Sequence, residues 1–112
     1  MSTIPSNNNL EIKLPQSSNI NTTIGLKHLN NNSSLYLKIL NSFKQRYTNI
    51  NIQTLNPEER ERTLHTIKGL TATLGMESLL YTIQELEKRF DETLLPLFSQ
   101  QLALVLEDIQ NI

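Results

Sequence analysis

Apolar residues recur at intervals of three and four from about residue 22 to the end of the chain, the spacing of amphipathic α-helices. They are mostly Leu and Ile, with a single valine. Segments containing Asn, Pro or Gly separate the periodic stretches and predict five helices, over residues 22–29, 33 or 34 to 47, 57–74, 77–90 and 94–112. Short connections between long amphipathic helices favour an all-α fold, an antiparallel four-helix bundle with a short extra N-terminal helix.

The third helix has the clearest boundaries. Asn56 is a good N-cap, Pro57 stands where its missing N–H costs nothing, and Glu59 completes a capping box. Gly75 can adopt the left-handed conformation that ends helices, so this helix is expected to end at Leu74. The second helix is expected to be capped by Ser33 or Ser34.

Helical periodicity also predicts which side chains point inward. The first two helices are expected to bury Ile24, Leu29, Leu35, Tyr36, Ile39, Leu40, Phe43 and Tyr47. The last two are expected to bury Leu79, Leu80, Ile83, Leu86, Phe90, Phe98, Leu102, Val105, Leu106 and Ile109.

Residues 1–21 contrast with this pattern. They are rich in Ser, Asn, Thr, Pro and Gln, and their few aliphatic residues follow no period. Such a composition is typical of a flexible tail or linker. We therefore divide the chain into a tail, residues 1–21, and a helical domain, residues 22–112.

Composition removes several classes of function. The chain has no cysteine, two histidines and three glycines, which argues against a disulfide framework, a thiolate nucleophile, a zinc cage and a glycine-rich phosphate loop. Ten basic and eleven acidic residues give a net charge of −1, so no basic field favours nucleic acid. Apolar runs are too short to insert in a membrane and the start does not resemble a signal peptide, so we expect a cytoplasmic protein.

The third helix carries the candidate chemistry. On a helical wheel Thr63, Leu64, Ile67, Leu70, Thr71 and Leu74 share the arc expected to face the core. His65 lies nearly opposite this arc and is expected to point into solvent, beside Lys68, Gly69 and Ala72. A glycine inside a helix costs about 1 kcal/mol relative to alanine, and core packing does not explain one on the outer face. The bare strip of Gly69 and Ala72 therefore indicates access for another protein.

This arrangement suits the acceptance and donation of a phosphoryl group. A neutral imidazole is nucleophilic near pH 7 without a neighbouring base, and a lysine nearby can neutralise phosphoryl charge. Glu61 lies one turn before His65, at a position from which it could accept a hydrogen bond from the imidazole. We interpret His65 as the phosphoacceptor, Lys68 as its charge partner, and Glu61, Gly69 and Ala72 as a docking surface.

The run HTIKGLTATLGMESLL, residues 65–80, resembles the signature of histidine-containing phosphotransfer (HPt) domains. The run IGLKHLNNNSSLYLKILNSF, residues 24–43, is similar to the entry helices of HPt domains attached to hybrid sensor histidine kinases, and Leu86-Glu87 matches a recurrent pair. One departure is Leu70, where many members have a small polar residue.

The resemblance implies a four-helix bundle that carries phosphate between the receiver domains of response regulators in a two-component phosphorelay. His65 would be the phosphorylated residue, Lys68 its partner, and Gly69 the residue that keeps the site open. Such a domain is a phosphocarrier and not an enzyme on its own. It binds no cofactor itself, since Mg²⁺ is expected on the partner receiver.

Three rival interpretations stay open. One is the phosphoacceptor domain of a chemotaxis-type kinase, which an ATP-bound catalytic domain phosphorylates directly. Another is a helical adaptor that binds a receiver without transfer. A dimerising histidine-kinase bundle is less favoured, because Thr66 stands where such helices usually have an acidic residue.

The sequence also bears on the oligomeric state. The apolar residues all fit the bundle interior with no exposed stripe left over, so we expect a monomer.

Overall fold

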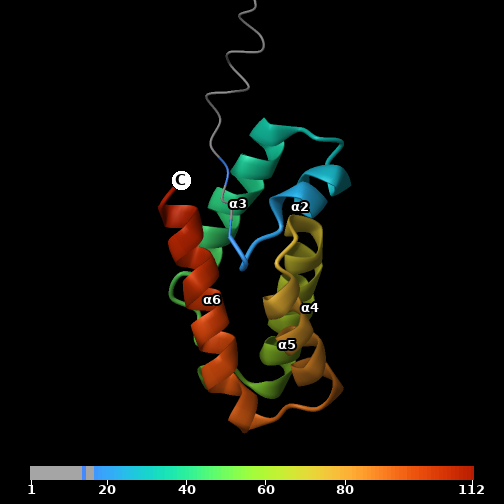
Figure 1. Cartoon of the computed structure of the whole chain (residues 1–112). Helices are drawn as coiled ribbons and strands as arrows, with labels where there is room; N and C mark the ends of the chain where they lie inside the picture. The colour runs from blue at the N-terminus through green and yellow to red at the C-terminus, as the bar shows by residue number, and fades with distance from the viewer. Residues whose placement is uncertain (1–13, 15–16) are drawn as a thin grey trace, which may run out of the picture.

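The computed structural model describes residue 14 and residues 17–112, which form an all-α protein (Figure 1). The longer helices lie side by side and give the molecule an elongated shape (Figure 1). In chain order the elements are α2 (Thr22–His28), α3 (Ser33–Tyr47), the 3-10 helix η1 (Ile52–Thr54), α4 (Pro57–Leu74), α5 (Glu77–Lys88), the 3-10 helix η2 (Glu92–Leu94) and α6 (Leu95–Gln110).

All five predicted helices are present, and their ends differ slightly from the prediction. The fourth was expected to reach Phe90, but α5 ends at Lys88 because the backbone of Arg89 is extended. Phe90 is instead half-buried beneath the guanidinium of Arg60, which lies 3.6 Å from the ring centroid. This contact attaches the end of α5 to the first turn of α4.

The caps follow the prediction at α4 and depart from it at α3. The Asn56 side chain accepts a hydrogen bond of 2.8 Å from the Glu59 N–H, and Gly75 ends α4 with a left-handed φ of 84°. At α3 the cap is Asn32, not Ser33 or Ser34, and its side chain accepts from the Leu35 N–H at 3.0 Å. Asn is as good an N-cap as Ser, so Asn32, which comes earlier in the chain, can take the capping position.

The four long helices contact one another in a ring. α3 packs against α4 and α6, and α5 packs against the same two helices. α4 and α6 are thus diagonal neighbours across the core (Figure 1). The buried apolar residues that fill the space between them and beneath their connections are Ile20, Tyr36, Leu40, Phe43, Tyr47, Ile52, Leu64, Ile67, Leu74, Met76, Leu79, Ile83, Leu86, Leu95, Phe98, Leu102, Val105 and Ile109.

Helix α2 packs close to the end of α4 because it carries a glycine. A Cβ added to Gly25 would collide with the Tyr36 ring and lie 2.6 Å from the Leu74 carbonyl oxygen. The Tyr36 hydroxyl donates a 2.6 Å hydrogen bond to that carbonyl. Burial raises the pKa of Tyr36 above its ordinary value, and the hydrogen bond with Thr22 acts in the opposite direction.

The residues just before α2, which the sequence analysis grouped with the tail, make specific contacts. Ile20 is 1% exposed, and the Asn21 N–H donates a 2.8 Å hydrogen bond to the Gly75 carbonyl. The Asp108 carboxylate on α6 accepts hydrogen bonds from the Ser17 hydroxyl and the Asn19 amide. The packed region therefore includes residues 17–21, whereas tail residues 1–13, 15 and 16 lie outside the described residues.

Not all of the expected inward positions are fully buried. Leu35 is exposed, and Ile24 and Leu80 are partly buried without belonging to the hydrophobics packed against the core. Partly buried but packed against the core are Leu29, Ile39, Phe90 and Leu106. Leu97 and Leu104 on α6 are exposed, so an apolar stripe is left over and the premise of the expected monomer is wrong.

The buried residues of α2 are Thr22 and Gly25. The periodicity of a short helix leaves its rotation open, and the close approach at Gly25 decides it here. Among the residues described, no helix combines the length and apolar character needed to cross a membrane.

Candidate functional site

Helix α4 holds His65 on its outer face, as the wheel predicted. The residues that α4 buries are Leu64, Ile67, Thr71 and Leu74. The side chain of His65 is 75% exposed, and Thr66 next to it is also exposed. The imidazole is therefore directly accessible to another molecule.

A carboxylate from the neighbouring helix lies beside the imidazole. Because α5 buries Leu79, Ile83 and Leu86, the next residue, Glu87, lies on the side of α5 that faces α4. Glu87 Oε2 is 3.6 Å from His65 Nδ1, which is within ion-pair range but too long for a hydrogen bond. The other ring nitrogen, Nε2, has no partner among the described residues.

The same carboxylate holds Lys68. The Lys68 ammonium nitrogen lies 2.8 Å from Glu87 Oε1, and the Glu87 side chain is only 20% exposed. Both oxygens of Glu87 are thus directed at the two candidate residues on α4. The carboxylate of Glu87 therefore lies between the imidazole of His65 and the ammonium group of Lys68.

Glu61 does not have the role that the sequence suggested. It is exposed, and neither an ion pair nor a hydrogen bond joins its side chain to His65 or to any other described residue. The acidic partner of His65 is Glu87, which lies on another helix. A contact between helices depends on their relative rotation and position along the axis, which the i, i+4 rule used for Glu61 does not address.

The open strip beside His65 is present. Gly69 is exposed, and a Cβ added to it would meet no atom within 4 Å. Ala72, a turn further along α4, is also exposed. No internal contact therefore accounts for the glycine, although it weakens the helix.

His65 and Glu87 also border an open depression that continues toward the start of α4. The lining residues are Pro57, Glu58, Glu61, Arg62, His65, Thr66 and Glu87. Arg62 pairs with Glu58 one turn earlier at 3.3 Å, and both side chains are largely exposed. The structure thus brings Glu61 near the site as part of its rim.

The second histidine lies elsewhere. His28 Nδ1 is 3.1 Å from the Thr73 carbonyl at the end of α4, and the residue is exposed. It has no lysine or carboxylate partner in the described part of the chain. Within residues 14 and 17–112, no three His, Asp or Glu side chains gather as a metal site would require.

Comparisons with known proteins add no relative. Neither the protein-family models, the curated proteins nor the solved structures contain a significant match to this chain. An exposed imidazole with one free nitrogen, a lysine and an oriented carboxylate can accept an electrophilic group and neutralise its charge.

Glu87 is a site residue that the sequence did not single out, since the pair Leu86-Glu87 entered only through the family resemblance. One sequence feature could have drawn attention to Glu87. Leu86 is an inward position of an amphipathic helix, so the residue after it borders the buried face and lies close to a neighbouring helix. The sequence alone does not say that this helix is α4.

Proposed function

We propose that this chain is a histidine phosphotransfer protein, which accepts a phosphoryl group on His65 from a receiver-domain aspartyl phosphate and passes it to another receiver. The observation that carries the proposal is the arrangement of His65, Lys68 and Glu87. The imidazole is exposed with Nε2 free, and one carboxylate contacts both Nδ1 and the lysine. The resemblance of residues 65–80 to the HPt signature agrees with it.

We also propose that α3, α4, α5 and α6 form the antiparallel four-helix bundle typical of such domains, with α2 as the short extra helix. The ring of contacts among the four helices supports this arrangement. Their short connections support opposite directions for successive helices.

The transfer step follows from the positions of the ring nitrogens. The lone pair of Nε2 attacks phosphorus, the bond between phosphorus and the aspartyl oxygen breaks, and the aspartate leaves as a carboxylate. The ring then carries positive charge, which the carboxylate of Glu87 beside Nδ1 stabilises. Donation to the second receiver reverses these bond changes.

Lys68 and the small residues have complementary roles. Lys68 neutralises charge on the phosphoryl oxygens, and a Mg²⁺ ion bound by the receiver would supply further charge neutralisation. Gly69 and Ala72 let the receiver surface approach the ring, and Glu61 lies on the rim that it would contact. The chain provides a carrier residue, so both phosphate donor and acceptor must come from partners.

The test compares phosphate donors. The full chain is incubated with a phosphorylated receiver domain, or with ATP and the catalytic domain of a chemotaxis-type kinase, and acid-labile phosphate on the chain is followed. We expect label from the receiver and its onward passage to a second receiver. Label from the kinase alone would favour the chemotaxis-type acceptor, and receiver binding without label would favour the adaptor.

A further inference from the structure

A second depression adjoins the one beside His65. It lies between the end of α3 and the first half of α4 and has a volume of about 360 Å³. Its lining residues are Arg46, Tyr47, Ile50, Arg62, Thr63 and Thr66, which include two cations and no carboxylate. Arg62 and Thr66 line both depressions, so a molecule that covers His65 on this side also covers the second depression.

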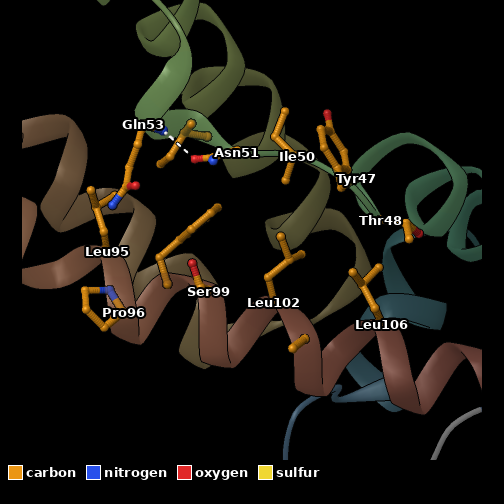
Figure 2. A pocket seen from close by; sticks show the side chains of 13 residues that line it. Tyr47, Thr48, Ile50, Asn51, Gln53, Leu95, Pro96, Ser99, Leu102 and Leu106 are labelled. Atoms are coloured by element: carbon orange, nitrogen blue, oxygen red, sulfur yellow. Dashed lines mark hydrogen bonds between the residues drawn. The ribbon is translucent and has the colours of Figure 1, made fainter.

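The hydroxyl groups around the second depression are available to an acceptor. Tyr47 is 3% exposed, and its hydroxyl makes no hydrogen bond with any described residue. Tyr47 also borders the groove drawn in Figure 2, where its hydroxyl points away from Leu102 and Leu106 on α6. Burial raises the pKa of Tyr47, so this hydroxyl keeps its proton near pH 7 and can donate it to a hydrogen bond. The Thr63 hydroxyl likewise has no partner in the described part of the chain.

The two arginines supply positive charge that the chain itself neutralises only weakly. Arg62 lies 3.3 Å from Glu58, but these side chains are 70% and 84% exposed, and such a pair contributes little and exchanges easily. The guanidinium carbon of Arg46 lies 5.6 Å from the centroid of the Tyr47 ring, and no described carboxylate pairs with it. A guanidinium group binds a carboxylate through two parallel N–H donors, so this depression suits an oxyanion.

We propose that the second depression binds a carboxylate side chain of the receiver domain whose aspartyl phosphate meets His65. The inference rests on the proposed function, which brings a receiver onto this part of α4. Because Mg²⁺ is held by carboxylates, the receiver surface around an aspartyl phosphate and its Mg²⁺ is acidic. Arg62 lies one turn before His65, close enough for a carboxylate near the phosphoryl group to contact it.

The charges on the two sides of His65 would then set the orientation of the receiver. Glu61 borders the depressions on the side of α5, next to Glu87, whereas Arg62 borders the one on the side of α3, next to Arg46. An acidic group of the receiver is repelled on the first side and attracted on the second. The arginine pair thus selects receivers that carry a carboxylate at the matching place.

The dependence of phosphotransfer on receiver concentration tests the site. We expect Arg46→Gln and Arg62→Gln each to raise the KM for the phosphorylated receiver about three- to fivefold, the loss of one partly exposed ion pair. Glu58→Gln should lower the KM, because it frees Arg62. Lys38→Gln is the matched control, since it removes an exposed positive charge of α3 outside the depression. An equal rise in Lys38→Gln, or an unchanged KM in both arginine variants, overturns the inference.

A hexaglutamate peptide tests the depression without phosphotransfer. In ¹⁵N nuclear magnetic resonance of the full chain, we expect the peptide to shift the amide signals of Thr63 and Thr66, and Arg46→Gln to weaken this binding. Inorganic phosphate at the same ionic strength is the second probe, and equal binding of phosphate would overturn the assignment to a carboxylate.

The two experiments separate this inference from the proposed function. Peptide binding at Thr63 and Thr66 in a chain that no receiver phosphorylates would support the carboxylate site and overturn the phosphotransfer function. Phosphorylation by a receiver, with peptide shifts spread evenly to Lys27 and Lys38, would overturn the carboxylate site alone.

Discussion

Lys68 on α4 and Glu87 on α5 form a 2.8 Å ion pair beside the exposed imidazole of His65. The pair joins two helices at the point where the candidate chemistry occurs. Glu87 is largely covered while His65 is open, so the carboxylate is held in place and can orient the ring. In the proposed reaction the ammonium group of Lys68 contacts both the carboxylate of Glu87 and the oxygens of the incoming phosphoryl group.

Glu87→Gln tests the role of the carboxylate as a positioning residue. A charged oxygen beside Nδ1 favours the neutral tautomer with its proton on Nδ1, which leaves the Nε2 lone pair free. We expect the variant to lose part of this tautomer, measured by ¹⁵N nuclear magnetic resonance of His65, and to accept phosphate several-fold more slowly. Glu61→Gln is the control for the tautomer measurement, since Glu61 lines the same depression without touching the ring. Equal tautomer populations in Glu87→Gln, Glu61→Gln and the wild type would contradict a positioning role for Glu87.

Lys68→Ala should keep the helical fold and shorten the lifetime of the phosphorylated form by about tenfold, because one charge-assisted contact with the phosphoryl oxygens is lost. It also leaves the carboxylate of Glu87 unneutralised. Adding Glu87→Gln to Lys68→Ala should therefore restore part of the lifetime. The control is Lys88→Ala, which removes an exposed lysine paired with Glu85. Comparable losses in both single variants would exclude a specific role for Lys68.

Gly69→Ala should raise stability, since its new Cβ meets no atom within 4 Å and helix propensity improves by about 1 kcal/mol. For a domain of this size we expect the Tm to rise by about 4–8 °C. Gly69→Leu should also fold but slow phosphotransfer by blocking the approach of the receiver. Thermal unfolding and transfer rates measure the two effects. Unchanged transfer in Gly69→Leu would remove the access argument.

Gly25→Ala should have the opposite effect on stability. Its Cβ would collide with the Tyr36 ring and lie 2.6 Å from the Leu74 carbonyl oxygen. Such overpacking costs about 1–3 kcal/mol. Urea unfolding should give a lower free energy of unfolding than in the wild type, and a gain similar to that of Gly69→Ala would show that α2 does not pack as described.

The buried tyrosines predict a loss of stability at high pH. Burial raises the pKa of Tyr36 and Tyr47 in the folded protein above the ordinary value of about 10. Above that pH the unfolded chain releases protons that the folded chain retains, so the free energy of unfolding falls as pH rises. Measured by urea unfolding between pH 8 and 11, the free energy of unfolding should fall less steeply with pH in Tyr47→Phe than in the wild type. The exposed Tyr81→Phe is the control, and an equal slope in all three proteins would be inconsistent with this cause.

The elements with local signals were predictable from the sequence. Asn56, Pro57 and Gly75 fix the ends of α4 through contacts within a few residues, and the helical period places His65 outside. Both features depend on positions close together in the chain. The prediction of α4 and of the exposed imidazole therefore succeeded without knowledge of the rest of the fold.

Features that depend on distant partners were not predictable in the same way. Glu87 reaches His65 only because α5 packs on α4 with one particular rotation. Ile20 is buried and its neighbour Asn21 bonds to Gly75, more than fifty residues later, although the local composition resembles a tail. Leu35 fits a helical period but lies at the edge of the buried face.

Locating the phosphoryl group tests the central claim most directly. After incubation with a phosphorylated receiver, mass spectrometry under conditions that preserve phosphohistidine identifies the modified residue in the wild type, His65→Gln and His28→Gln. We predict label on His65 in the wild type and in His28→Gln, and none on His65→Gln. Undiminished label on His65→Gln, or a wild-type chain that no phosphorylated receiver labels, would contradict the account.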